Sequence, residues 1–103
     1  MSKTVLIVDD SRMMREMLNS TLRDGGFEVV QAEDGVAGLS ALDQSKPDVI
    51  ITDIQMPYLT GIELANKLAE NETTRAYPII VLTARGYKLD NESLDGTGIR
   101  AIL

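Results

Sequence analysis

The chain has 103 residues, enough for one domain whose core buries roughly 60 to 68% of the unfolded surface. Its net charge of -6 argues against nucleic-acid binding, because contacts to phosphates need clustered Lys and Arg. The absence of Cys excludes disulfides, and the absence of His leaves oxygen ligands, which favour Mg²⁺, Ca²⁺ or Mn²⁺ over zinc or copper. No apolar run approaches the roughly 20 residues of a membrane span, so a cytoplasmic location is expected.

Strand and helix patterns alternate along the chain. Apolar, β-branched runs predict strands at 4–8, 27–32, 49–53 and 79–83, and a further strand is expected to begin at Ile99. Apolar residues at helical spacing predict a helix after each of the first three strands, beginning near Ser11, Asp34 and Gly61. This alternation is typical of an α/β fold with a parallel sheet.

The first predicted helix has clear start and stop signals. Ser11 or Asp10 can cap its amino end, and Gly25-Gly26 can end it. Its methionines, Met13, Met14 and Met17, are interpreted, together with Met56, as core or loop packing residues without a functional role.

Acidic residues end two of the predicted strands. Asp9 and Asp10 follow the first strand, and Asp53 ends the strand at 49–53. Each acid alone has an ordinary explanation, as a helix cap or a loop residue. Together at one sheet edge, however, they repel one another unless a cation or raised pKa values relieve the repulsion. The sequence therefore predicts a divalent cation site, and Mg²⁺ fits better than Ca²⁺ because it needs few carboxylates.

Thr83 ends the predicted strand at 79–83 with a hydroxyl group. Threonine is a common strand residue, so taken alone this position needs no functional explanation. Beside the Asp53 strand, its hydroxyl could donate a hydrogen bond to a phosphoryl oxygen carried by Asp53.

Four stretches together carry a resemblance that covers almost the whole chain. They are Val8-Asp9-Asp10, Thr52-Asp53-Ile54-Gln55-Met56-Pro57, Gly61 and Val81-Leu82-Thr83-Ala84. In order and spacing they resemble the receiver domain of bacterial two-component response regulators. The resemblance implies a doubly wound, flavodoxin-like sheet of five parallel strands in the order 2-1-3-4-5.

The resemblance also implies a role for each site residue. Asp53 would be the phosphoacceptor for a histidine kinase or phosphotransfer protein, and Thr83 would move toward the aspartyl phosphate. Asp10 would bind Mg²⁺ directly, Asp9 through water, and Gln55 through its backbone carbonyl, with Asp53 completing the metal site. Gln55 and Arg85 would tune the lifetime of the phosphate. The domain would not be an enzyme beyond self-catalysed phosphoryl transfer and hydrolysis.

The chain departs from the family pattern at its carboxyl end. Family receivers carry a lysine after the fifth strand and then a fifth helix, and neither is present here. Residues 1–103 are therefore expected to form a receiver domain that is incomplete at this end, with Ile102 at the switch position. Apolar side chains of the first helix would be exposed, which predicts a homodimer, a domain swap or low stability.

Two rival interpretations stay open. One is a receiver-like interaction module that cannot switch because the lysine and last helix are absent. The other is a Mg²⁺-dependent phosphatase of another doubly wound family with Asp53 as nucleophile. Such a phosphatase would be expected to carry an acid at the position that Gln55 occupies.

Overall fold

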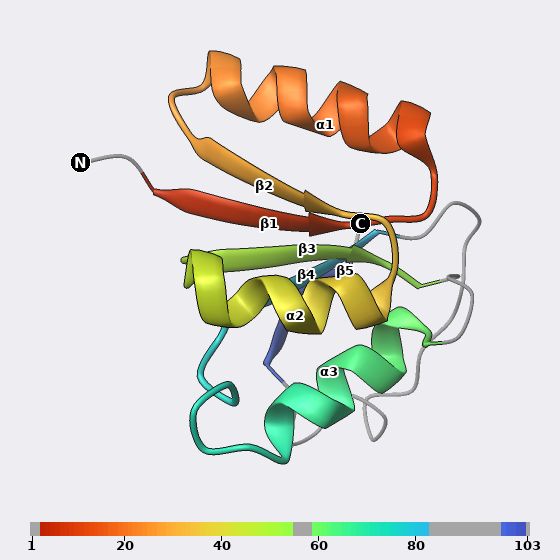
Figure 1. The fold of residues 1–103 in the computed structure, drawn as a ribbon, viewed down its shortest axis with the longest axis vertical. Helices are drawn as coiled ribbons and strands as arrows, with labels where there is room; N and C mark the ends of the chain where they lie inside the picture. Colours follow the sequence, from red (N-terminus) through yellow and green to blue (C-terminus); the bar gives the residue numbers. More distant parts are fainter. Residues whose placement is uncertain (1–2, 55–58, 83–97, 103) are drawn as a thin grey trace.

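The computed structural model describes residues 3–54, 59–82 and 98–102, and within these ranges five strands alternate with three helices (Figure 1). The elements are β1 (Thr4–Val8), α1 (Arg12–Asp24), β2 (Glu28–Ala32), α2 (Gly35–Ser45), β3 (Val49–Asp53), α3 (Gly61–Ala69), β4 (Ile79–Leu82) and β5 (Ile99–Ile102). The predicted strand and helix positions are confirmed to within a few residues. None of the helices in this part of the chain is long and apolar enough to cross a membrane.

All five strands form one parallel sheet in the order β2-β1-β3-β4-β5, which confirms the order that the family resemblance implied. Figure 1 shows α1 on one face of this sheet and α2 and α3 on the other. Because every strand runs in the same direction, the carboxyl ends of β1 and β3 lie at the same edge.

The strand β1, which lies between β2 and β3, is buried on both faces, as its unbroken apolar sequence predicted. Its side chains alternate between two clusters, because successive residues of a strand point to opposite faces. Leu6 and Val8 belong to the larger cluster, which includes residues of α2 and α3. Val5 and Ile7 belong to the smaller cluster, against which Leu18 and Leu22 of α1 pack. The core therefore holds the ends of β1 and β3 rigidly.

Side-chain caps fix the start of each helix. Ser11 caps α1 by accepting a hydrogen bond from the Met14 N–H at 3.2 Å, which decides between the two predicted caps. Asp34 caps α2 by accepting from the Ala37 N–H at 2.8 Å. Thr60 begins α3 with a capping box, a feature that the sequence analysis missed.

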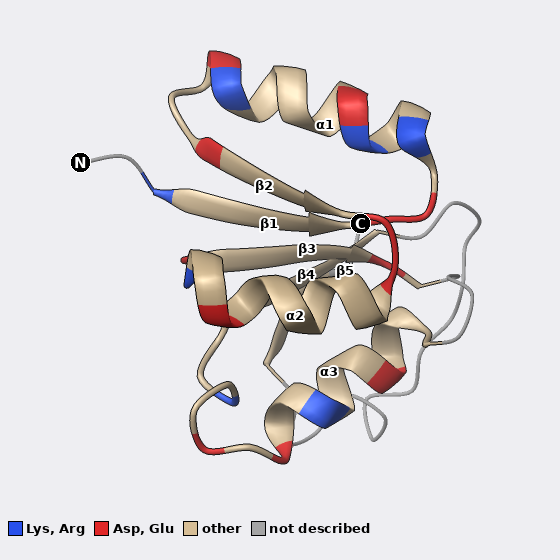
Figure 2. Ribbon diagram, in the orientation of Figure 1, with Lys and Arg blue, Asp and Glu red and all other residues tan. Residues whose placement is uncertain are grey.

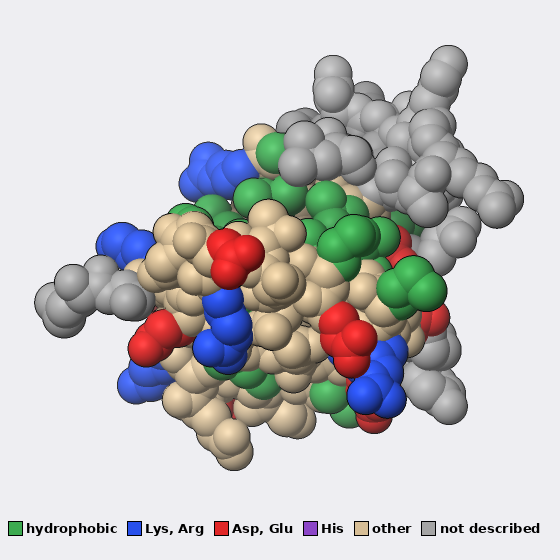
Figure 3. Space-filling view, turned by 90° about the horizontal axis from the view of Figure 1, so that it is seen from above, with side chains coloured by type: hydrophobic (Ala, Val, Ile, Leu, Met, Phe, Trp, Pro, Cys, Tyr) green, Lys and Arg blue, Asp and Glu red, His purple; other side chains and the backbone are tan. Residues whose placement is uncertain are grey.

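Two apolar side chains of α1 are exposed, which agrees with the expectation of exposed apolar side chains on this helix and not with the interpretation of its methionines as packing residues. Met13 is 79% exposed and Met17 is 55% exposed, so the interpretation of these two residues as packing residues is wrong. Met56 lies outside the described residues. Figure 3 looks onto the α1 side of the molecule and shows hydrophobic side chains at the surface beside the helix. Helical spacing identifies apolar positions, but here Leu18 and Leu22 are the ones that pack on the sheet.

Candidate metal centre

Three carboxylates come together at the carboxyl edge of the sheet. Val8 of β1 lies opposite Thr52 of β3, so the residues that follow them, Asp9 and Asp53, lie side by side at the carboxyl edge of the sheet. One carboxylate oxygen each of Asp9, Asp10 and Asp53 lies within 4.8 Å of the others. Figure 2 shows acidic residues on the chain that leaves β1 and β3 at this edge. The predicted convergence of these three acids is confirmed.

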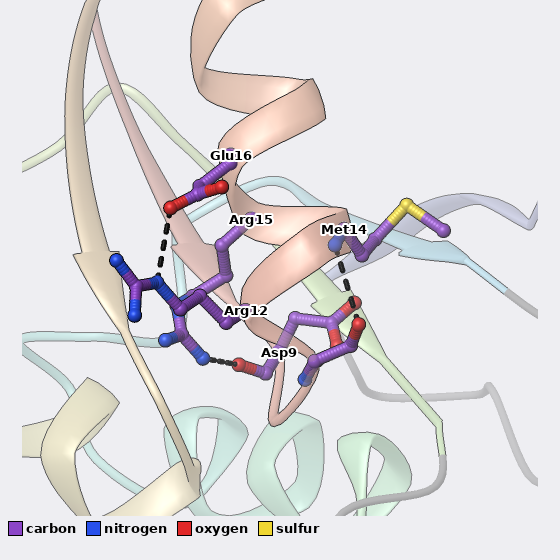
Figure 4. A network of polar contacts seen from close by, with 6 residues as sticks. Asp9, Arg12, Met14, Arg15 and Glu16 are labelled. Carbon is purple, nitrogen blue, oxygen red and sulfur yellow. Dashed lines mark hydrogen bonds and ion pairs between the residues drawn. The ribbon is translucent and has the colours of Figure 1, made fainter.

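Asp9 is only 3% exposed and is held by three hydrogen bonds. Its backbone N–H donates to the Ala32 carbonyl at 3.1 Å, which ties it to the end of β2. Its Oδ1 accepts from the Ser11 N–H at 2.8 Å, and its carbonyl oxygen accepts from Arg15 Nη1 at 2.6 Å (Figure 4). This buried carboxylate therefore has a fixed position.

The pKa of Asp9 is raised above its ordinary value, chiefly because burial disfavours the charged form. The Ser11 N–H lowers the pKa by binding the carboxylate, whereas the negative charges of Asp53 and Asp10 raise it. The guanidinium of Arg15 lowers it. The site thus concentrates like charges that a bound cation would relieve.

Asp53 ends β3, and the start of α3 packs against its backbone. Its carbonyl oxygen accepts from Thr52 Oγ1 at 3.0 Å. A Cβ atom at Gly61 would lie 2.2 Å from that same carbonyl oxygen, so only glycine fits there. The Gly61 N–H donates to the Ile54 carbonyl at 2.9 Å. Asp53 is partly exposed, and these contacts fix the position of its backbone.

The chemistry of this donor set fits a hard divalent cation. Oxygens on opposite sides of a Mg²⁺ ion lie about 4.2 Å apart, since each Mg–O bond is about 2.1 Å long. The spread of the three carboxylates, within 4.8 Å, is close to that span. Asp9, Asp10 and Asp53 therefore form a donor set that could hold such an ion.

The structure does not describe the other predicted site residues. Gln55, Thr83 and Arg85 lie outside the described residues, and so does the side chain of Ile102. Conversely, the sequence analysis missed Arg15, which contacts the residue six positions before it. No standard helical or strand spacing marks such a pair, so only the fold of the loop between β1 and α1 reveals it.

Comparison with known proteins places these features in a family. The family model described as "Response regulator receiver domain" matches residues 5–102. The phosphate regulon transcriptional regulatory protein PhoB of Pseudomonas aeruginosa is 43% identical over 84 residues, which are 82% of this chain. The match spans only 37% of the length of PhoB.

Solved structures agree with the sequence comparison. The Vibrio cholerae chemotaxis protein CheY4 superposes with a TM-score of 0.90 at 33% identity, over 100% of this chain and 86% of that one. The Thermotoga maritima response regulator protein TrrA, solved in complex with Mg²⁺-BeF, gives a TM-score of 0.84 at 30% identity, over 98% and 85% of the two chains. With the sheet order, the acidic edge and the family match in agreement, this chain belongs to the response regulator receiver domain family.

Proposed function

We propose that the chain is a phosphoacceptor, in which Asp53 receives a phosphoryl group in a step that depends on Mg²⁺. The observation that carries this proposal is the convergence of three carboxylates within 4.8 Å at the ends of β1 and β3. The family match and the Mg²⁺-BeF complex of TrrA support it. The donor is a phosphohistidine of a histidine kinase or phosphotransfer protein.

In the transfer, a carboxylate oxygen of Asp53 attacks the phosphorus atom. The bond from phosphorus to the donor imidazole nitrogen breaks, the imidazole takes up a proton, and Asp53 becomes an acyl phosphate. Mg²⁺, when bound, neutralises charge so that two anions can approach each other. The chain itself contributes positioning, because the fixed backbones of Asp9 and Asp53 hold the carboxylates before the donor arrives.

Asp10 and Asp9 are proposed as the metal-binding side chains beside Asp53, together with the backbone carbonyl of Gln55. Thr83 directly follows Leu82, which pairs with Asp53 in the sheet. This neighbouring position supports Thr83 as the hydroxyl that contacts the phosphate and shifts the population toward an active conformer.

Intact-mass spectrometry after incubation with acetyl phosphate and Mg²⁺ tests the proposal. We expect one phosphoryl addition on the parent chain, none on Asp53→Asn, and none when a chelator replaces Mg²⁺. Asp43→Asn is the matched control, because Asp43 is an exposed acid of α2 outside the cluster. It should be modified like the parent.

Two results would contradict the proposal. One is no addition to a folded parent chain, which would favour the interaction module. The other is an equal addition to Asp53→Asn, which would place the acceptor elsewhere. Steady hydrolysis of a small phosphomonoester would instead indicate the phosphatase, since a phosphoacceptor forms a single adduct.

A further inference from the structure

The first turn of α1 carries two arginines, of which one lies on the surface and the other contacts the loop before the helix. Arg12 is 83% exposed and pairs with Glu16 on the surface, with Nε 3.0 Å from Oε1. Arg15 is partly buried and turns back to the loop, where its Nη1 donates to the Asp9 carbonyl at 2.6 Å (Figure 4). The chain therefore places one fixed positive charge directly beside the acidic cluster.

Several hydrogen bonds besides that of Arg15 hold the loop between β1 and α1. The Asp9 N–H is bound to the Ala32 carbonyl, and the Ser11 N–H binds Asp9 Oδ1. Ser11 Oγ in turn caps the helix at the Met14 N–H. Losing the Arg15 hydrogen bond removes one restraint among several, so the carboxylates should keep their arrangement.

The charge of Arg15, by contrast, has no substitute among the groups found to act on Asp9. The two neighbouring acids, Asp53 and Asp10, carry negative charge, and Arg15 is the cation acting on Asp9 within the described residues. A guanidinium stays protonated in proteins, so this charge is permanent. It offsets part of the repulsion among the acids when no metal is bound, and it repels any cation that enters.

We propose that Arg15 sets the metal affinity of the acidic cluster, holding it below what the three carboxylates alone would give. This inference rests on the proposed metal site. For a divalent ion roughly 8 Å from the guanidinium, Coulomb's law corresponds to about a sixfold change in affinity at the dielectric constant of water, about 80, and to a larger change at the lower effective dielectric near a protein surface. Screening at about 0.1 M salt reduces the interaction energy by about half, so a change of about twofold or more remains. Arg15 thus acts through the electric field at the carboxylates and not as a ligand.

The test is a titration with Mg²⁺ by calorimetry and with Mn²⁺ by electron paramagnetic resonance, at about 0.02 M and about 0.2 M salt. Arg15→Gln removes the charge, and Arg15→Lys keeps it. Arg12→Gln is the matched control, because it changes the net charge equally from the same helical turn but does not contact Asp9. Thermal unfolding without metal reports the structural effect of each substitution.

We expect Arg15→Gln to bind both ions at least about two to six times more tightly than the parent, with a ratio that shrinks as salt rises. The same variant should unfold at a lower temperature without metal, because it loses a hydrogen bond and a favourable charge. A merely structural role predicts weaker binding together with lower stability. The opposite signs of the two effects therefore separate the field effect from a structural one.

Equal or weaker binding by Arg15→Gln would overturn the inference, and so would equal tightening by Arg12→Gln. If Arg15→Gln does not fold, Arg15→Lys still tests the idea, since it should stay within about twofold of the parent. Much tighter binding by Arg15→Lys would therefore contradict it. If the parent binds neither ion, the proposed metal site fails too. If the parent binds the ions and Arg15→Gln binds them with the same affinity, only this inference is overturned.

Discussion

Replacing Gly61 with alanine should destabilise the fold and displace Asp53, the proposed acceptor, at the same time. Gly61 is the first residue of α3 and is buried against the end of β3. An added Cβ would lie 2.2 Å from the Asp53 carbonyl oxygen, 3.0 Å from its carbonyl carbon and 3.2 Å from Ile54 Cα. All three atoms belong to the backbone, so no side-chain rotation can relieve the clash.

The loss in free energy of unfolding depends on which atoms must move to make room for the added Cβ. Overpacking in a core typically costs about 1 to 3 kcal/mol, and it costs less where a flexible side chain can yield. At Gly61 the backbone of β3 or the start of α3 must shift, so we expect about 3 kcal/mol or more. For a domain of this size that corresponds to a fall in melting temperature of roughly 12 °C or more.

Two other glycines provide a graded control. At Gly25 the nearest atom to an added Cβ is the Leu22 carbonyl oxygen at 3.4 Å, and φ is -80°, so alanine fits. Gly25→Ala should leave stability unchanged or raise it by about 0.4 to 1 kcal/mol through the unfolded state. At Gly38 the added Cβ would meet Val8 Cγ2 at 2.9 Å, a side-chain contact, so a loss between these two extremes is expected.

Thermal unfolding followed by circular dichroism measures the series, and phosphoryl addition measured under identical conditions reports Asp53. Gly61→Ala should lose both stability and phosphorylation, whereas Gly25→Ala should lose neither. The reasoning is refuted if Gly61→Ala unfolds within a few degrees of the parent. A destabilised Gly61→Ala that is still phosphorylated at the parent rate, at a temperature where it is folded, would refute the link to Asp53.

Two further predictions concern the pH dependence and a helix cap. Because the pKa of Asp9 is raised in the folded state, its contribution to stability is greatest below the ordinary aspartate pKa of about 3.9 and is lost as pH rises through the raised pKa. In the presence of a chelator, the melting temperature of Asp9→Asn should therefore fall less with rising pH than that of the parent. At neutral pH the melting temperature of Asp9→Asn should be the higher of the two. An unchanged pH profile would contradict this. Thr60→Ala removes the capping box of α3 and should cost about 1 kcal/mol, or roughly 4 to 8 °C in melting temperature. Thr60→Ser, which keeps the hydroxyl, should stay close to the parent.

Local signals in the sequence were sufficient to predict most of the fold. Unbroken β-branched runs marked the buried strands, and Ser11, Asp34 and the glycines after α1 marked helix ends, because each of these effects acts within a few residues. The strand order came from the family resemblance, since alternation alone allows several parallel sheets. The acids were predicted to converge because parallel strands deliver their ends to one edge.

The features that the sequence did not predict depend on contacts between helices, strands and loops. Met13 and Met17 have the composition of a packing face but stay exposed, because Leu18 and Leu22 supply the contact with the sheet. The choice between Asp10 and Ser11 as the cap required side-chain geometry, and the structure assigns it to Ser11. Arg15 reaches Asp9 across a loop, at a separation that no periodic pattern marks.

At this site, the clustered carboxylates that would bind a metal ion lower the stability of the metal-free fold. Strands with almost fully buried side chains hold Asp9 and Asp53 where their charges repel, so the fold without a cation carries an electrostatic cost. The Ser11 N–H and the Arg15 guanidinium reduce that cost without removing it, since the pKa of Asp9 is still raised. A divalent cation that binds only the folded chain would remove more of it, stabilising the fold by about 2.7 kcal/mol at a hundredfold excess over its Kd. Any substitution that relieves the repulsion in another way, as Asp9→Asn does, must therefore gain stability without metal and lose the response to metal together.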